Sequence, residues 1–276
     1  MYIEDIKEDN LWLMKGDCLE RMQEIPDGSV DLILTDPPYE TTACKWDSVI
    51  PLEPMWEQLK RIIKPNGVIV MTASEPFTSV LCVSNISNLR EKLVWVKHKP
   101  SNFSCGKVMH LKYHEDVVVF CKGKPTYIPQ MQPRKSDRVS QMQKGKSKKW
   151  NTVRSDGEEV SFKTQYDPKE WSDYDANMKY PSTVVEIPAV ASNSLEKVKH
   201  PTQKPVALME YLIKTYTNEN ETVLDFTMGS GTTGVACTNT NRKFIGIESH
   251  SFVLSMHQWN FVCPLESYCH VLLLFY

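Results

Sequence analysis

The 276-residue sequence lacks the features of a secreted, metal-stapled or membrane-spanning protein. Its eight cysteines are scattered and form no Cys-x-x-Cys pair, which argues against disulfides and favours reduced thiols in a cytoplasm. The acidic N-terminus has no apolar signal core, and no run approaches the roughly 20 apolar residues of a membrane span. We therefore expect no membrane segment.

A metal site and an excess of charge are absent as well. His98, Cys105, His110 and His114 fit no standard zinc spacing, so we expect no bound metal. Net charge is only −2, so any affinity for a polyanion must come from a local patch. With 41% hydrophobic and 24% charged residues, the chain has the composition of an ordinary globular protein that can bury a full core.

One stretch organises the rest of the sequence. Residues 30–35 form a β-branched and aliphatic run that predicts a buried strand. Asp36-Pro37-Pro38-Tyr39 follows directly, and its two prolines end the strand and remove two backbone donors. We expect the carbonyls of Asp36 and Pro37 to remain free as acceptors beside a carboxylate and an aromatic ring. The alternative is a plain strand-ending turn with a packed tyrosine.

The chain around this stretch alternates between short apolar runs and helical periodicity, which favours βαβ units and a parallel sheet. Further strands are predicted at 11–14, 68–72, 91–97, 116–121, 222–226 and 243–247. Helices are predicted at 18–25, 54–63, 76–84, 206–216 and around 235–237, and residues 64–67 (Lys-Pro-Asn-Gly) are predicted to be a turn.

Composition changes from Lys122 to about Tyr180, where the apolar period is lost. Residues 131–150 carry many cations against the single acid Asp137, with Trp and Tyr residues following. Two interpretations remain open: a solvated loop, or a surface whose lysines and arginines displace counterions from nucleic acid.

A second pattern lies at 225–248, where a strand, a glycine-rich turn, a helix and a strand end in an acid. Residues 229–234 match G-x-G-x-x-G, and Glu248 lies near the offset of a ribose-binding carboxylate. This predicts a nucleotide-type cofactor, but NAD and S-adenosylmethionine share the requirement for ribose binding.

The two patterns together favour methyl transfer over hydride transfer. A dehydrogenase gives no reason for Asp-Pro-Pro-Tyr, whereas an exocyclic amine is a weak nucleophile that needs hydrogen-bond acceptors. The Asp36 carboxylate and the Pro37 carbonyl would accept both amino hydrogens, and Asp36 would take up the proton. Tyr39 would stack on a base extruded from the duplex.

These motifs resemble the amino-methylating DNA methyltransferases, which act on adenine N6 or cytosine N4, in the motif order of the β group. Asp36-Pro37-Pro38-Tyr39 matches the catalytic motif, and residues 64–67 match the turn before the next strand. The resemblance implies cofactor-binding roles for Asp17, Thr202, Lys204, Asp225, Thr227, Gly229, Gly231, Thr232, Thr233 and Glu248.

The resemblance implies a three-layer, Rossmann-like α/β fold of the S-adenosylmethionine-dependent methyltransferase type, with a mostly parallel sheet. The catalytic half would occupy residues 1–121, an inserted recognition region 122–185 and the cofactor half 186–248, followed by an atypical tail at 249–276. The tail carries one charged residue, Glu266, and has no helical period. DNA contacts are expected at Arg134, Lys135, Lys144, Lys146, Lys148 and Lys149.

The implied activity is methylation of adenine N6 at a specific sequence of double-stranded DNA in the cytoplasm of a bacterial or phage-infected cell. A restriction endonuclease partner, an orphan enzyme and a homodimer are all open. The alternatives are a cytosine-N4 enzyme, a DNA-binding homologue impaired by its atypical C-terminus and, more distantly, a dehydrogenase.

Overall fold

A computed structural model describes residues 5–40, 47–134, 152–153, 159–160, 175, 177–198 and 200–249. The chain divides into two compact units, which we describe separately. One unit contains the residues up to Ile128 and those from Thr183 onward, and the other contains Pro129–Ser182. The predicted insertion at 122–185 is wider than this second unit, because residues 122–128 and 183–185 belong to the first.

The first unit alternates strands and helices along the chain. Its strands are β1 (Ile6–Glu8), β2 (Leu11–Lys15), β3 (Val30–Thr35), β4 (Ile63–Ala73), β5 (Leu89–Val96), β6 (His114–Phe120), β11 (Val184–Glu186), β12 (Thr222–Asp225) and β13 (Lys243–Glu248). Its helices are α1 (Cys18–Arg21), α2 (Leu52–Ile62), α3 (Phe77–Ser84), α5 (Val206–Tyr216) and α6 (Thr232–Asn239), with 3-10 turns η1 (Met22–Glu24), η2 (Ile86–Asn88) and η3 (Phe103–Cys105).

In the described residues the strands of this unit form one nine-stranded sheet in the order β1-β2-β13-β12-β3-β4-β6-β5-β11. The neighbouring pairs from β2 to β4 are all parallel, whereas β6 is antiparallel to both β4 and β5. The predicted α/β architecture with a mostly parallel sheet is therefore present.

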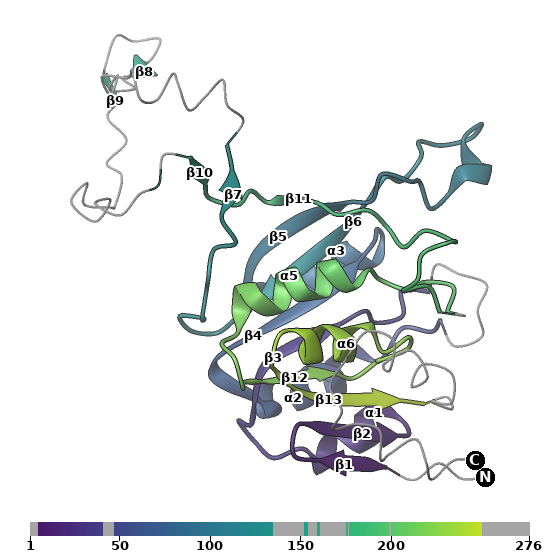
Figure 1. Cartoon of the computed structure of the whole chain (residues 1–276), viewed down its shortest axis with the longest axis vertical. Helices are drawn as coiled ribbons and strands as arrows, with labels where there is room; N and C mark the ends of the chain where they lie inside the picture. Colours follow the sequence, from purple (N-terminus) through teal and green to yellow (C-terminus); the bar gives the residue numbers. More distant parts are fainter. Residues whose placement is uncertain are drawn as a thin grey trace. The chain divides into compact units, whose positions relative to one another are not determined.

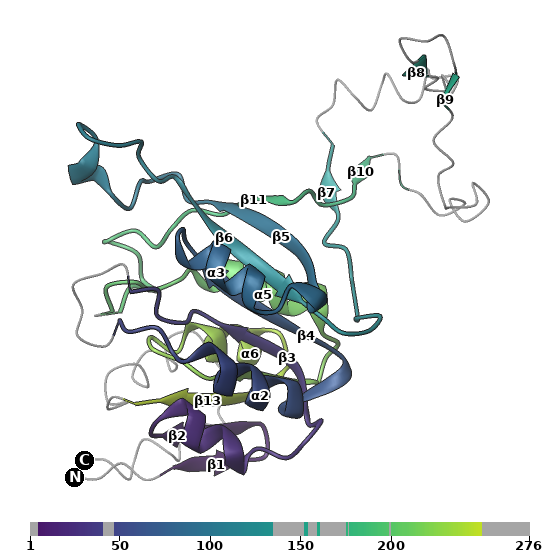
Figure 2. The ribbon, with the colours of Figure 1, turned by 180° about the vertical axis from the view of Figure 1, so that it is seen from behind.

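Helices cover both faces of this sheet and make three layers. Alternate residues of β3 point to opposite faces: Leu32 and Leu34 pack in the cluster that contains α5, while Ile33 packs with α2 and α3. Figure 1 shows α5 and α6 in front of the sheet, and Figure 2 shows α2 and α3 on the other side. Because both faces are buried, the central strands read as continuous apolar runs in the sequence.

The second unit is described only in part. β7 (Gln132–Pro133) pairs antiparallel with β10 (Met178–Lys179), and β8 (Thr152–Val153) pairs antiparallel with β9 (Glu159–Val160).

The predicted strands agree with the structure to within two residues, apart from β4. The turn expected at residues 64–67 is wrong, because β4 begins at Ile63 and includes these residues. Ile63 pairs with Val30, and the register then shifts before Leu32 pairs with Val68. The Lys64 ammonium binds the Asp31 carboxylate at 2.7 Å, which helps to hold this segment along β3.

A membrane-spanning helix and a metal-binding cluster are both absent from the described residues. No helix among them is long and apolar enough to cross a membrane. No group of three or more His, Cys, Asp or Glu side chains in the same residues could hold a metal ion.

Gly67 lies where β4 runs close to β3, and an added Cβ would meet Ile63 Cγ1 at 2.6 Å and the Asp31 carbonyl oxygen at 2.9 Å. We expect Gly67→Ala to lower the free energy of unfolding by about 1–3 kcal/mol, because backbone must shift to accept the methyl group. Urea denaturation followed by circular dichroism measures this. Gly106→Ala is the control, since its nearest contact would be an ordinary 3.4 Å. Equal stability of the two variants would contradict the close approach.

Candidate active site

The two sequence motifs meet because their strands are neighbours in the sheet. β3 and β12 run parallel, with Leu32 opposite Val223 and Ile33 opposite Leu224. Both strands therefore end at the same edge, with Asp36 following β3 and the glycine turn following β12. The carboxyl edge of an open α/β sheet is where ligands bind.

A buried carboxylate joins these two strand ends. Asp225 Oδ1 accepts hydrogen bonds from Thr35 Oγ1 at 2.8 Å and from the Thr227 amide at 3.1 Å, and Oδ2 accepts one from Thr233 Oγ1 at 2.6 Å. Burial raises the pKa of Asp225 to about 6, although these hydrogen bonds oppose the shift.

The Asp36 carboxylate is held from several sides and keeps 23% of its side chain exposed. Oδ1 accepts hydrogen bonds from the Tyr39 hydroxyl at 2.5 Å and from the Thr72 hydroxyl, and Oδ2 binds Lys204 Nζ at 2.6 Å. Because a carboxylate offers about four lone-pair positions, these donors leave room for one more. The arrangement therefore orients the carboxylate and still leaves it able to accept a hydrogen bond from a ligand.

Lys204 links Asp36 to a second carboxylate. Its ammonium lies 3.5 Å from Glu115 Oε2, and Lys97 Nζ lies 2.7 Å from Glu115 Oε1. Both lysines are almost fully buried. Burial alone would lower the pKa of Lys204, but Asp36 and Glu115 outweigh it, and the pKa is raised. The two lysines likewise overcome burial at Glu115 and lower its pKa.

Tyr39 is fixed by its ring, its hydroxyl and its backbone. The ring stacks on Phe77 with centroids 5.5 Å apart, and the amides of Tyr39 and Glu40 donate to Asp47 Oδ1 at 2.8 and 2.9 Å. Burial and the Asp36 carboxylate raise the pKa of the Tyr39 hydroxyl, so it remains a donor.

The expectation of two free carbonyls is wrong for one of them. The Asp36 carbonyl accepts a hydrogen bond from Thr227 Oγ1 at 3.2 Å, which ties the loop after β3 to the turn after β12. Among the described residues, none donates to the Pro37 carbonyl. Because a carbonyl oxygen has two lone pairs, Asp36 keeps one acceptor position and Pro37 keeps both.

The glycine turn and Glu248 lie at the same edge. Gly229 and Gly231 have φ of +49° and +75°, and the Gly229 amide donates to Glu248 Oε2 at 2.8 Å. A Cβ on Gly229 would lie 3.2 Å from His200 Nε2, so only glycine leaves this close approach unstrained. Burial lowers the pKa of His200, which favours the neutral ring.

Asp17 and Glu248 end neighbouring strands. Glu248 pairs with Lys15 in the parallel ladder of β13 and β2, and its carbonyl accepts from the Gly16 amide at 3.0 Å. Asp17 Oδ1 caps α1 by accepting from the amides of Leu19 and Glu20. Two carboxylates at adjacent strand ends are well placed to bind a polyhydroxylated ligand.

The predicted site residues thus fall into distinct environments. Asp36, Tyr39, Lys204, Asp225, Thr227 and Thr233 belong to one connected network. Thr232 bonds Ser230, and Thr202 lies 3.5 Å from His200. Lys204 was expected at the cofactor, and its contacts are with Asp36 and Glu115. Arg134 lies in the second unit, with its Nε donating to the Met178 carbonyl. Lys135, Lys144, Lys146, Lys148, Lys149 and the tail from residue 250 lie outside the described residues.

Sequence reasoning missed Thr72, Lys97 and Glu115. Glu115 carried a usable signal, because Glu115 and Asp116 are a pair of acids that precede the buried apolar run Val117–Phe120 and so mark a strand end.

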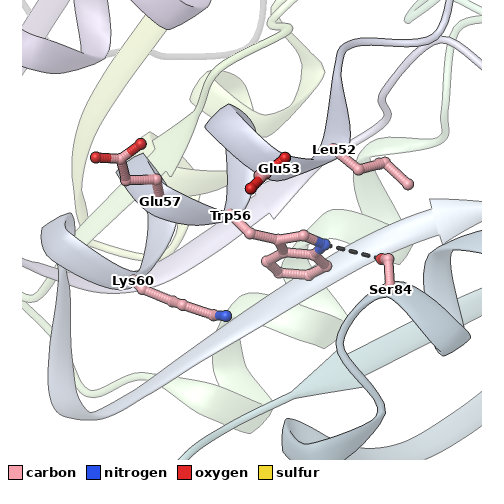
Figure 3. A pocket seen from close by; sticks show the side chains of 6 residues that line it. All are labelled: Leu52, Glu53, Trp56, Glu57, Lys60 and Ser84. Carbon is pink, nitrogen blue, oxygen red and sulfur yellow. Dashed lines mark hydrogen bonds between the residues drawn. The ribbon is translucent and has the colours of Figure 1, made fainter.

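A pocket between α2 and α3 is separate from this network. Leu52, Glu53, Trp56, Glu57, Lys60 and Ser84 line it, and Trp56 Nε1 donates to Ser84 Oγ at 2.8 Å (Figure 3). No predicted site residue lines it.

Comparison with solved structures identifies the class of fold. The M1.HpyAVI–SAM complex superposes with a TM-score of 0.57 at 24% identity over 92% of this chain and all of that chain. The PvuII DNA methyltransferase (cytosine-N4-specific) superposes with a TM-score of 0.61 at 17% identity, covering 95% of this chain and 89% of that one. The predicted methyltransferase fold is therefore confirmed.

Residues 30–258 match the DNA methylase family (N6_N4_Mtase), and the chain belongs to that family. The DNA adenine methyltransferase YhdJ of Escherichia coli (strain K12) is 28% identical over 88% of this chain and 80% of its own length. The Type II methyltransferase M2.MboI of Moraxella bovis is 26% identical over 93% of this chain and 90% of its own length.

The raised pKa of Asp225 predicts a pH dependence of stability. The folded value of about 6 lies above the ordinary 3.8, so this group stabilises the fold fully below pH 4 and loses that contribution as pH rises through 6. At about 1.4 kcal/mol per pKa unit, the loss is of the order of 3 kcal/mol. We expect Asp225→Asn, which cannot ionise, to gain stability relative to wild type between pH 4 and 7.5.

Urea denaturation of both proteins at several pH values measures this difference. Asp27→Asn is the control, because the Asp27 side chain is 77% exposed and should show no comparable gain. If the stability difference between Asp225→Asn and wild type does not change with pH, the pKa of Asp225 is not raised by burial.

Proposed function

We propose that this protein transfers a methyl group from S-adenosylmethionine to N6 of adenine in double-stranded DNA. The observation that carries the proposal is the position of Asp36. Its carboxylate is oriented by Tyr39, Thr72 and Lys204, and its backbone carbonyl is tied through Thr227 and Asp225 to the glycine turn. Family membership and the relatives named as adenine and type II methyltransferases support the same activity.

The residues beside the glycine turn fit the cofactor. Glu248 has one carboxylate oxygen held by the Gly229 amide, and Asp17 lies on the neighbouring strand end, so both suit the ribose and adenine of a nucleoside. The glycine at 229 allows close approach beside His200, where Thr202 also lies. When bound, S-adenosylmethionine supplies an electrophilic methyl group on its sulfonium.

Asp36 and Pro37 supply the acceptors that the target amine needs. One amino hydrogen is accepted by the remaining lone-pair position of Asp36, and the other by the Pro37 carbonyl. These bonds draw the nitrogen lone pair out of conjugation with the ring. Transfer of the methyl group would break its bond to sulfur, which leaves as a neutral thioether, and would form the new nitrogen–carbon bond. Asp36 would take up the amine proton directly or through water. Lys204 and the two hydroxyls keep the carboxylate in place during this step.

Tyr39 holds the base. Phe77 stacks on its ring, and Lys204 Nζ lies over the ring at 5.7 Å from the centroid, so a base extruded from the duplex would stack on the ring beside this ammonium. The basic residues from 134 to 149 would bind phosphates elsewhere on the duplex. The relatives come from bacteria, and we infer action on DNA in the cytoplasm of a bacterial or phage-infected cell. A partner endonuclease, an orphan role and a homodimer all remain compatible with this activity.

The product identifies the target base. The purified chain is incubated with S-adenosylmethionine tritiated in its methyl group and with unmethylated genomic DNA, and the DNA is digested to nucleosides. We expect the label in N6-methyldeoxyadenosine. N4-methylcytosine alone would overturn the adenine assignment and leave amine methylation standing. Label in neither nucleoside, with DNA binding retained, would favour a non-catalytic DNA-binding protein.

Removal of the Asp36 carboxylate tests the chemical step. We expect Asp36→Ala to reduce methyl transfer by a factor of at least about 100, because it loses a positioned proton acceptor. Binding of S-adenosylmethionine, measured by calorimetry, should persist. Asp27→Ala, an exposed aspartate in an ion pair with Arg61, should retain normal transfer. A loss smaller than about tenfold in Asp36→Ala would contradict the role of Asp36 as proton acceptor.

A further inference from the structure

Residues 97–113 form a hairpin arm between β5 and β6 (Figure 1). Its stem is held by backbone hydrogen bonds from Lys97 to Tyr113 at 2.8 Å and from Ser101 to Lys112 at 3.1 Å. The Asn102 side chain braces the tip by donating to the His110 carbonyl and accepting from the Lys112 amide. The arm therefore has a defined shape that its own hydrogen bonds maintain.

The tip of this arm exposes large apolar side chains. Phe103 is 80% exposed, Val108 83%, Met109 54% and Tyr113 46%. So many exposed apolar groups within a short, ordered segment are unfavourable in water and are typical of a binding surface.

The arm carries positive charges and no negative ones. Residues 97–113 contain four lysines and no Asp or Glu. Lys97 is buried against Glu115, and Lys112 Nζ binds Ser74 Oγ and the Glu75 carbonyl. Lys99 and Lys107 are exposed on the arm. Apolar and aromatic groups beside unopposed cations complement a ligand that carries both phosphates and flat bases.

The arm also starts at the edge of the sheet that carries Asp36. Asp116 near the start of β6 pairs with Ala73 at the end of β4, and β4 runs parallel to β3. Lys97, at the base of the arm, contacts Glu115, which contacts Lys204, which contacts Asp36. A duplex that presents a base to Asp36 would therefore lie next to the arm.

We propose that this arm binds duplex DNA beside the target base, with Lys99 and Lys107 on phosphates and Phe103 against bases. This inference rests on the proposed function. It adds a second DNA-contacting surface to the basic run expected at residues 134–149. The exposed tip is then buried by the duplex, which explains why apolar side chains are kept there.

The test is salt-dependent binding of the full chain to a fluorescent mixed-sequence duplex, measured by anisotropy. We expect Lys99→Gln/Lys107→Gln to weaken binding and to reduce the slope of log Kd against log salt by about 1.8, at roughly 0.9 per lost phosphate contact. Phe103→Ser should weaken binding about fivefold or more without changing the slope, because an apolar contact with the base steps of the duplex is lost rather than charge.

Matched controls lie away from this edge. Lys60→Gln/Lys243→Gln removes two exposed lysines from the end of α2 and the start of β13. Val83→Ser changes an exposed apolar residue of α3. Both should retain the wild-type Kd and slope. All variants should keep the wild-type melting temperature and affinity for S-adenosylmethionine, since none of these side chains is buried.

The outcomes separate the inference from the proposed function. Arm variants that match their controls in Kd and slope, while the wild type methylates DNA, would overturn the inference and leave the function intact. A wild type that binds no duplex would overturn both. A wild type that binds DNA without transferring methyl, with arm variants still weakened, would overturn the function alone and support the arm as a DNA-binding surface.

Discussion

The contact between Asp225 and its three donors is the interaction on which the site depends. It lies where β3 and β12 end side by side, and it joins Thr35, directly before Asp36, to Thr227 and Thr233 in the turn and helix that follow β12. Thr227 then reaches the Asp36 carbonyl. Two motifs 191 residues apart in the sequence are thereby fixed relative to each other by a few buried hydrogen bonds, each of which is stronger there than in water.

The second constraint is charge balance around Asp36. Two carboxylates, Asp36 and Glu115, face two largely buried ammonium groups, Lys204 and Lys97. Such a group of charges contributes little net stability, because desolvation offsets most of the attraction, yet loss of one member leaves an uncompensated buried charge. The network therefore serves orientation: Lys204 and the hydroxyls of Tyr39 and Thr72 fix the direction of the Asp36 carboxylate before any ligand binds.

The sequence predicted local structure well and long-range side-chain pairing poorly. The strands before Asp36 and before Gly229 are apolar runs with strong terminators, and both were found where expected. The turn at 64–67 was wrong because proline and glycine were interpreted without the partner strand. Ile63 and Val68, on either side of these residues, both pair with β3, and β4 continues through them. The contact of Lys204 with Asp36 spans 168 residues and depends on strand order. The spacing of residues in the sequence does not reveal strand order. Lys204 was therefore assigned to the cofactor, and Glu115 and Lys97 were not considered.

The hydrogen bond from Thr227 to Asp36 sharpens the chemistry of the proposed reaction. Thr227 takes one of the two lone pairs of the Asp36 carbonyl, and the acceptors that we assign to the target are one position on the Asp36 carboxylate and the Pro37 carbonyl. Two acceptors match a group with two hydrogens on one nitrogen, such as an exocyclic amine. A ring nitrogen with one hydrogen, or a hydroxyl, would leave one acceptor without a partner, at a cost of about 1–3 kcal/mol if that acceptor is buried. The same threonine that links the two motifs therefore also takes up one of the acceptor positions beside the target.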